Sequence, residues 1–189
     1  AIFLALVVGA ILWGDDYETV ITANGNEALW IFVGSSGLLT LVGILDDRFK
    51  LGVSIRVLCE ILVALVVIES LELNLTNIGA LFGETPIKIP SAVAYPLTVV
   101  AIVGFINAFN MLDGMDGLLA SLVITILLSF HVITQTLPGL VSMFISASLI
   151  AFLLSNLGLS PMIPRTFLGD AGSRLLGFIV ICLLLGAAS

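Results

Sequence analysis

Apolar runs near the length needed to cross a lipid bilayer recur along the whole chain, and they limit its fold more than any other feature. Seven such runs are present, at residues 1–13, 28–45, 54–69, 91–109, 118–134, 139–155 and 174–188. About 20 apolar residues in a helix span the hydrocarbon core of a membrane. Backbone groups in hydrocarbon must find hydrogen-bond partners within the protein, so these runs predict helices. The short alternating segments of a transmembrane barrel are absent from the sequence.

The composition argues against a water-soluble domain. The 189 residues are 60% hydrophobic and 10% charged, with a mean hydropathy of +1.26, whereas soluble domains carry about 25% charged residues. We therefore expect an all-α, polytopic transmembrane helical bundle in a lipid bilayer, with about seven spans in one domain, residues 1–189. Because Ala1 and Ser189 lie within or just after apolar runs, we expect the chain to be a fragment. Cys59 and Cys182 lie in apolar runs and are interpreted as small buried side chains.

The basic residues orient the predicted helices. Connections separated by two crossings share a side of the membrane, which groups residues 46–50, 110–117 and 156–173 on one face. Five of the six basic residues lie in or beside this group: Arg48, Lys50, Arg56, Arg165 and Arg174. The positive-inside rule therefore places this face in the cytoplasm. On the opposite, outer face, alternating stretches within residues 70–90 predict a small periplasmic β-hairpin.

Aspartates are concentrated in the three connections of the cytoplasmic face: Asp46, Asp47, Asp113, Asp116 and Asp170. Carboxylates gathered on one face repel one another, and a divalent cation with a phosphate ligand would stabilise them, because hard cations take oxygen ligands. Glycines after Asp113 and Asp116 permit tight turns and close approach to a ligand. Around Asp170 and Ser173, simple capping of the following helix remains an alternative.

The spacing of the charged residues argues against other uses of them. An EF-hand counted from Asp113 would need glutamate at loop position twelve, where Ile124 stands. A transporter or channel predicts carboxylates inside the spans, and we expect none at a helix centre. Arg56 and Glu60 are four residues apart, which is interpreted as a local ion pair.

Three motifs follow one another in the chain: Asp46-Asp47-Arg48-Phe49, Asn107-Ala-Phe-Asn110-Met-Leu-Asp113-Gly-Met-Asp116-Gly-Leu118 and Phe167-Leu-Gly-Asp170-Ala-Gly-Ser173. In type and order they resemble those of the polyprenyl-phosphate N-acetylhexosamine-1-phosphate transferases, the MraY/WecA family. The resemblance covers essentially the whole chain. The sequence Asn-Ala-Phe-Asn-Met is more similar to the WecA type than to the MraY type, for which Asn-Ala-Val-Asn-Leu-Thr is expected.

The resemblance implies Mg²⁺-dependent transfer of N-acetylglucosamine 1-phosphate from UDP-GlcNAc, a UDP-N-acetylhexosamine, to undecaprenyl phosphate, with release of UMP. Such a reaction is the first membrane step of O-antigen, enterobacterial common antigen or related cell-envelope polysaccharide synthesis. It implies a multi-pass protein of the bacterial inner membrane, a cytoplasmic active site, Mg²⁺ or Mn²⁺ as cofactor and no nucleic-acid partner. An MraY-type phospho-MurNAc-pentapeptide transferase and a non-enzymatic membrane carrier remain alternatives.

The resemblance also implies roles for single residues. Asp170 would be the leading metal ligand, with Asp47 assisting at the metal or phosphate. Asp46 would orient or deprotonate the lipid phosphate. The catalytic set would be completed by Asp113 and Asp116, and the substrate-binding set would be Asn110, Arg48 and Ser173. The family's His-rich loop and basic first loop lie outside residues 1–189, so this chain alone is expected to be inactive.

The motif spacing differs from that of two other classes of membrane transferase. CDP-alcohol phosphotransferases require Ala-Arg and further aspartates after Asp-Gly, whereas Leu118 and an apolar run follow Gly117. Prenyltransferases require adjacent Asn and Asp, whereas Asn110 and Asp113 are three residues apart. The small residues Gly34-Ser-Ser-Gly37 would permit close helix packing, within the chain or in a homodimer.

Overall fold

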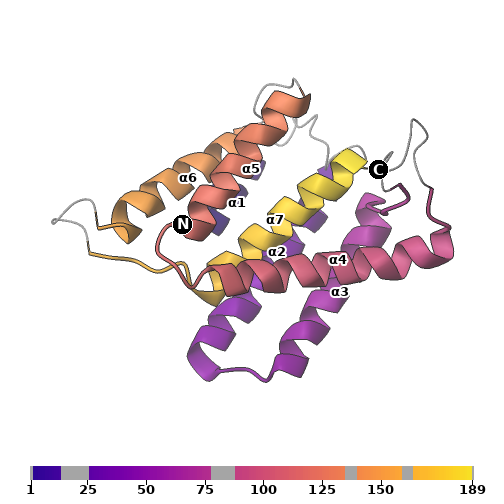
Figure 1. The fold of residues 1–189 in the computed structure, drawn as a ribbon, viewed down its shortest axis with the longest axis horizontal. Helices are drawn as coiled ribbons and strands as arrows, with labels where there is room; N and C mark the ends of the chain where they lie inside the picture. Colours follow the sequence, from indigo (N-terminus) through magenta and orange to yellow (C-terminus); the bar gives the residue numbers. More distant parts are fainter. Residues whose placement is uncertain (1, 14–25, 78–87, 135–139, 159–163, 189) are drawn as a thin grey trace.

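The fold is a helical bundle, seen here in a computed structural model that describes residues 2–13, 26–77, 88–134, 140–158 and 164–188 (Figure 1). Within these ranges the elements are α1 (Ile2–Trp13), α2 (Asn26–Phe49), α3 (Val53–Leu71), α4 (Ser91–Leu112), α5 (Leu118–Thr134), α6 (Leu140–Asn156) and α7 (Gly169–Ala188). Each helix corresponds to one of the apolar runs. The expectation of an all-α bundle is confirmed.

Three helices are long and apolar enough to cross a membrane: Glu27–Phe49 of α2, Ser91–Leu112 of α4 and Gly169–Ala187 of α7. The apolar helices α1, α5 and α6 are shorter. Helix α3 carries three charged residues, Arg56, Glu60 and Glu69. Of the seven predicted spans, three therefore meet the requirements of length and composition within the described residues.

Helix α7 occupies the centre of the bundle (Figure 1). It packs against α2 and α4 on one side, while α1, α5 and α6 form the other side of the molecule. Its side chains are almost completely buried from Ser173 to Cys182, and Phe178 stacks on Phe32 of α2 with ring centroids 5.4 Å apart. The first turn of α7 is therefore held firmly beside the ends of its neighbours.

Glycines allow the backbones around α7 to touch. A Cβ atom on Gly43 of α2 would lie 2.3 Å from the Cα atom of Ala171, and one on Gly177 would lie 3.0 Å from the Cα atom of Ile106. In the Gly34–Gly37 stretch, an added Cβ on Gly37 would meet Phe3 at 3.1 Å, whereas one on Gly34 would meet nothing within 4 Å. Gly37 thus serves packing inside the chain, and a homodimer stays a prediction.

One expectation about local structure needs correction, and another falls mostly outside the described residues. The outer connection is expected to form a β-hairpin, and its described residues contain one isolated antiparallel bridge, Asn77–Lys88, and no strand. Residues 78–87, the centre of that connection, lie outside the described residues. The aspartates expected in loops also lie mostly in helices: α2 continues through Asp46-Asp47 to Phe49, and Asp170 stands in the first turn of α7. Helices extend past their apolar runs because their polar ends reach beyond the hydrocarbon.

Candidate active site

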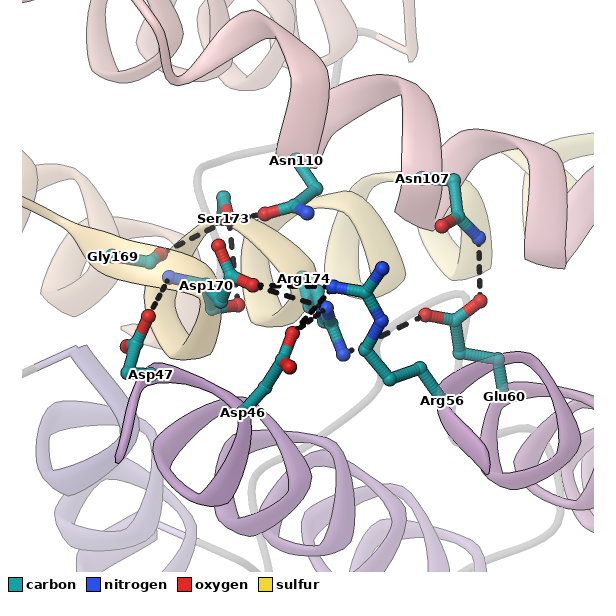
Figure 2. A network of polar contacts seen from close by, with 10 residues as sticks. All are labelled: Asp46, Asp47, Arg56, Glu60, Asn107, Asn110, Gly169, Asp170, Ser173 and Arg174. Atoms are coloured by element: carbon teal, nitrogen blue, oxygen red, sulfur yellow. Dashed lines mark hydrogen bonds and ion pairs between the residues drawn. The ribbon is translucent and has the colours of Figure 1, made fainter. Parts of the chain in front are cut away.

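The three motifs meet at one end of the bundle, where the end of α2, the end of α4 and the start of α7 come together (Figure 2). The backbone N–H of Asp170 donates to Oδ1 of Asp47 at 3.2 Å. The hydroxyl of Ser173 donates to Oδ1 of Asn110 at 2.8 Å. Residues separated by more than 60 positions in the sequence therefore share hydrogen bonds across three helices.

Two arginines hold the carboxylates of this end together. Nη1 of Arg56 and Nη2 of Arg174 each lie 2.6 Å from Oδ2 of Asp46. The same two nitrogens lie 3.7 Å and 3.2 Å from Oδ2 of Asp170. The Asp46 side chain is 4% exposed, so these contacts form where water competes little for the charges. The arginines cross-link α2, α3 and α7.

The expectation of a local ion pair between Arg56 and Glu60 is wrong, because the ion pairs of both residues are with other helices. Arg56 reaches instead to α2 and α7, and Glu60 points into the bundle, where it accepts a hydrogen bond from Nδ2 of Asn107 (Figure 2). Glu60 is completely buried near the middle of α3, so the expectation that no carboxylate lies at a helix centre is also wrong. Its Oε1 faces Nη1 of Arg174 at 4.0 Å. That partner lies 114 positions away, beyond the reach of helical spacing.

Asp113 follows α4 and faces the other aspartates. Its pKa is raised to about 6, chiefly by burial and further by the negative charges of Asp170 and Asp47, while the backbone N–H of Gly169 acts in the opposite direction. Burial and neighbouring carboxylates both disfavour the ionised form of a carboxyl group. Asp113 therefore belongs to the same electrostatic centre as Asp47 and Asp170.

Two of the predicted site residues stay apart from this network. Asp116 is exposed and makes no ion pair or hydrogen bond within the described part of the chain. Arg48 is also exposed, and its guanidinium group lies 5.7 Å from the centre of the Phe49 ring. Both lie at the same end of the bundle as the other motif residues, but neither forms an ion pair or hydrogen bond with the described aspartates, Asn110 or Ser173.

Comparison with known proteins identifies the family of this arrangement. Residues 29–188 match the model of a protein family described as glycosyl transferase family 4. The chain belongs to this family. It is 35% identical over 159 residues to the undecaprenyl-phosphate alpha-N-acetylglucosaminyl 1-phosphate transferase of Escherichia coli (strain K12), which covers 82% of this chain and 43% of that protein. The resemblance inferred from the motifs is confirmed.

Relatives from other bacteria agree. The protein of the same name from Yersinia pestis is 36% identical over 161 residues, which is 83% of this chain and 44% of that protein. A probable undecaprenyl-phosphate N-acetylglucosaminyl 1-phosphate transferase from Bacillus subtilis (strain 168) is 33% identical over 192 residues, 98% of this chain and 49% of that protein. The chain thus spans about half the length of the curated relatives it matches.

The oxygen-rich end of this family 4 chain suits a hard divalent cation. Five carboxylates (Asp46, Asp47, Glu60, Asp113 and Asp170) stand near only two guanidinium groups, which leaves an excess of negative charge when all are ionised. Among the described residues, no three His, Cys, Asp or Glu side chains are arranged to enclose a metal ion. Mg²⁺ typically uses one or two carboxylates, with substrate phosphates and water as further ligands. The donor set therefore fits such an ion in chemistry, with Asp47 and Asp170 as candidate ligands.

Asn156, at the end of α6, ties two connections of the site together and was missed from the sequence. Its Oδ1 accepts from the backbone N–H of Gly117 at 2.6 Å, and its Nδ2 donates to the backbone carbonyl of Thr166 at 2.8 Å. The first contact fixes the turn that carries Asp113 and Asp116, and the second fixes the approach to α7. Its only signal in the sequence is an amide at the end of an apolar run.

Replacing Asn156 by alanine should lower the free energy of unfolding by about 1–2 kcal/mol, because the part-buried N–H of Gly117 and carbonyl of Thr166 lose their partner. The activity of the full-length protein should fall as well, since the turn at Gly117 and the approach to α7 at Thr166 both adjoin motif residues. Thermal unfolding in detergent would measure the loss. Ser148→Ala is the matched control, because the Ser148 hydroxyl donates only within its own helix, to the Ile145 carbonyl. Equal melting of the two variants would contradict the role given to Asn156.

Proposed function

We propose that the full-length protein transfers N-acetylglucosamine 1-phosphate from UDP-GlcNAc to undecaprenyl phosphate and releases UMP, as the first membrane step of a cell-envelope polysaccharide. The names of the relatives specify this acceptor and this transferred group. The observation that carries the proposal is the meeting of the three motifs at one end of an apolar bundle. A water-soluble nucleotide sugar and the phosphate of a membrane lipid can meet only at such an end.

The proposed reaction joins two anions, so it depends on in-line positioning and neutralised charge. An oxygen of the lipid phosphate attacks the phosphorus that carries the sugar, the bond to the UMP phosphate breaks, and UMP leaves with the bonding electrons. Asp170 and Asp47 would hold Mg²⁺, with Mn²⁺ as a substitute. When bound, the ion supplies positive charge to the diphosphate.

The contacts of the other residues support different parts in this reaction. Asp46 accepts two guanidinium contacts on one oxygen, which supports a role in orienting the site rather than as a free base. Ser173 donates to Oδ1 of Asn110, and the amide N–H groups of Asn110 would then bind a substrate oxygen. Asp113 shares the centre of negative charge and is proposed to position the nucleotide. The roles of Asp116 and Arg48 are supported by the motifs alone.

The proposal is tested by reconstituting the full-length protein in liposomes with undecaprenyl phosphate and measuring UMP release from UDP-GlcNAc. Release should require the lipid acceptor and stop when divalent cations are chelated. UMP release without the acceptor, or no release under any condition, would refute the proposed transfer. Turnover of UDP-MurNAc-pentapeptide but not of UDP-GlcNAc would instead establish the MraY-type reaction.

We further propose that the motif end faces the cytoplasm of a bacterial inner membrane. Single cysteines at the strongly exposed positions Phe49, Met115 and Phe167 should then react with a membrane-impermeant maleimide only in inverted vesicles. A cysteine at the exposed Ile133, near the other end of α5, is the matched control and should react in intact cells. The background variant lacks the native cysteines. Labelling of any motif-end position in intact cells would overturn this orientation.

A further inference from the structure

A second layer of the polar network lies behind the aspartates and takes part in none of the roles above. Glu60 of α3 is 0% exposed and Arg174 of α7 is 1% exposed, so two side chains that normally carry charge are completely buried. Neither residue belongs to the predicted site. Buried ionisable groups are costly unless they have partners of opposite charge.

Arg174 joins the two aspartates of the motifs to this deeper layer (Figure 2). Its Nη2 lies 2.6 Å from Oδ2 of Asp46 and 3.2 Å from Oδ2 of Asp170. Its Nη1 faces Oε1 of Glu60 at 4.0 Å, and Oε2 of Glu60 accepts from Asn107 of α4. The connected groups come from α2, α3, α4 and α7.

Glu60 faces the part of the Arg174 guanidinium that the aspartates do not contact. Asp46 and Asp170 both approach Arg174 at Nη2, and both also approach Nη1 of Arg56. Nη1 and Nε of Arg174 and Oε1 of Glu60 have no hydrogen-bond partner among the described residues. The nearest opposite charge on that side of Arg174 is therefore Glu60, and their attraction is strong where water is excluded.

We propose that Glu60 and Arg174 are positioning residues of the transfer site. Arg174 holds the carboxylates of Asp46 and Asp170 against one another, and Glu60 keeps the Arg174 guanidinium buried in the position that allows this. Neither residue touches substrate; both act through the aspartates. The proposal rests on the function proposed above, but the pairing itself has a separate readout in protein stability.

Glu60→Gln is the first test in the full-length protein. Glutamine keeps the shape of the side chain, but its NH₂ group must face either the guanidinium of Arg174 or the Nδ2 group of Asn107, and donor then meets donor. The melting temperature should fall by about 5 °C or more. The kcat for UMP release should fall about tenfold, with the KM for UDP-GlcNAc changed less than about twofold, because alignment is lost rather than ground-state binding.

Arg174→Gln, alone and combined with Glu60→Gln, separates charge balance from positioning. The single variant leaves Glu60 buried without its partner and should melt lowest. In the double variant both buried charges are gone, so it should melt above the Arg174→Gln variant. Its kcat should nevertheless stay at least about tenfold below wild type, because the contacts of Arg174 with Asp46 and Asp170 remain absent. Arg174→Lys should recover part of the kcat, since it keeps the charge.

Glu69→Gln is the matched control, because Glu69 also lies on α3 and also accepts a hydrogen bond from α4, at 3.1 Å from Tyr95, away from the motifs. It should leave kcat unchanged. If Glu60→Gln and Arg174→Gln lower the melting temperature additively, the pairing of Glu60 with Arg174 is overturned, whether or not the protein transfers phosphosugar. A wild-type kcat in Glu60→Gln or in the double variant would overturn the positioning role. If the wild-type protein shows no transfer, the proposed function and the positioning role are both refuted. Non-additive melting of the variants would in that case still support the pairing of Glu60 with Arg174.

Discussion

Asp170→Asn in the full-length protein should lower UMP release by at least about a thousandfold while the protein still inserts and folds. Asparagine is nearly the same size but loses the charge that faces Arg174 at 3.2 Å and Arg56 at 3.7 Å. It also removes one of the two candidate ligands for a divalent cation. The backbone N–H of residue 170 can still donate to Asp47, so the first turn of α7 should keep its place.

The measurement is UMP release at several Mg²⁺ concentrations, with thermal melting of the same preparation. A raised Mg²⁺ requirement in the residual activity would support the ligand role. Glu27→Gln is the matched control, because Glu27 is also an acid in the first turn of a helix, at the start of α2. That variant should be as active as wild type. Unchanged Mg²⁺-dependent release in Asp170→Asn would remove Asp170 from the metal role.

Much of the fold could be predicted from the sequence because its cause is local. In a membrane, a run of apolar residues favours a helix because its backbone hydrogen bonds are satisfied locally, and each predicted run corresponds to one helix of the structure. The ends were less predictable: α2 continues through Asp46 and Asp47 because the helical hydrogen bonds persist into the aqueous region, up to Lys50 with a positive φ of 50°. Hydropathy marks the hydrocarbon boundary, which is not the end of the helix.

The site was predictable only where it consists of a motif. Asp47, Asn110, Asp170 and Ser173 were selected as neighbours from their type and crossing order, and the structure brings them into contact. Glu60 was assigned to the wrong partner because sequence spacing reveals only helical neighbours, while the charge it balances lies on α7. Such partners depend on how the helices pack, which no single segment encodes.

Gly43→Ala should disrupt both the fold and the site, although it adds only one methyl group. The new Cβ atom would lie 2.3 Å from the Cα atom and 2.6 Å from the backbone nitrogen of Ala171. These are backbone atoms, so no side-chain rotation can relieve the contact and α2 must move away from α7. Asp46 lies one turn beyond Gly43 and Arg174 one turn beyond Ala171, so the movement would stretch their 2.6 Å contact directly.

We expect Gly43→Ala to lower the free energy of unfolding by about 1–3 kcal/mol, as overpacking does, and to lower transfer about a hundredfold. Gly34→Ala is the control on the same helix: nothing lies within 4 Å of its added Cβ atom, and alanine favours helix more than glycine. That variant should melt at or above the wild-type temperature with full activity. Ala171→Gly should not rescue Gly43→Ala, because the atoms in conflict belong to the backbone of residue 171. Rescue by Ala171→Gly, or equal melting of the Gly43 and Gly34 variants, would show that α2 and α7 do not touch through their backbones at this point.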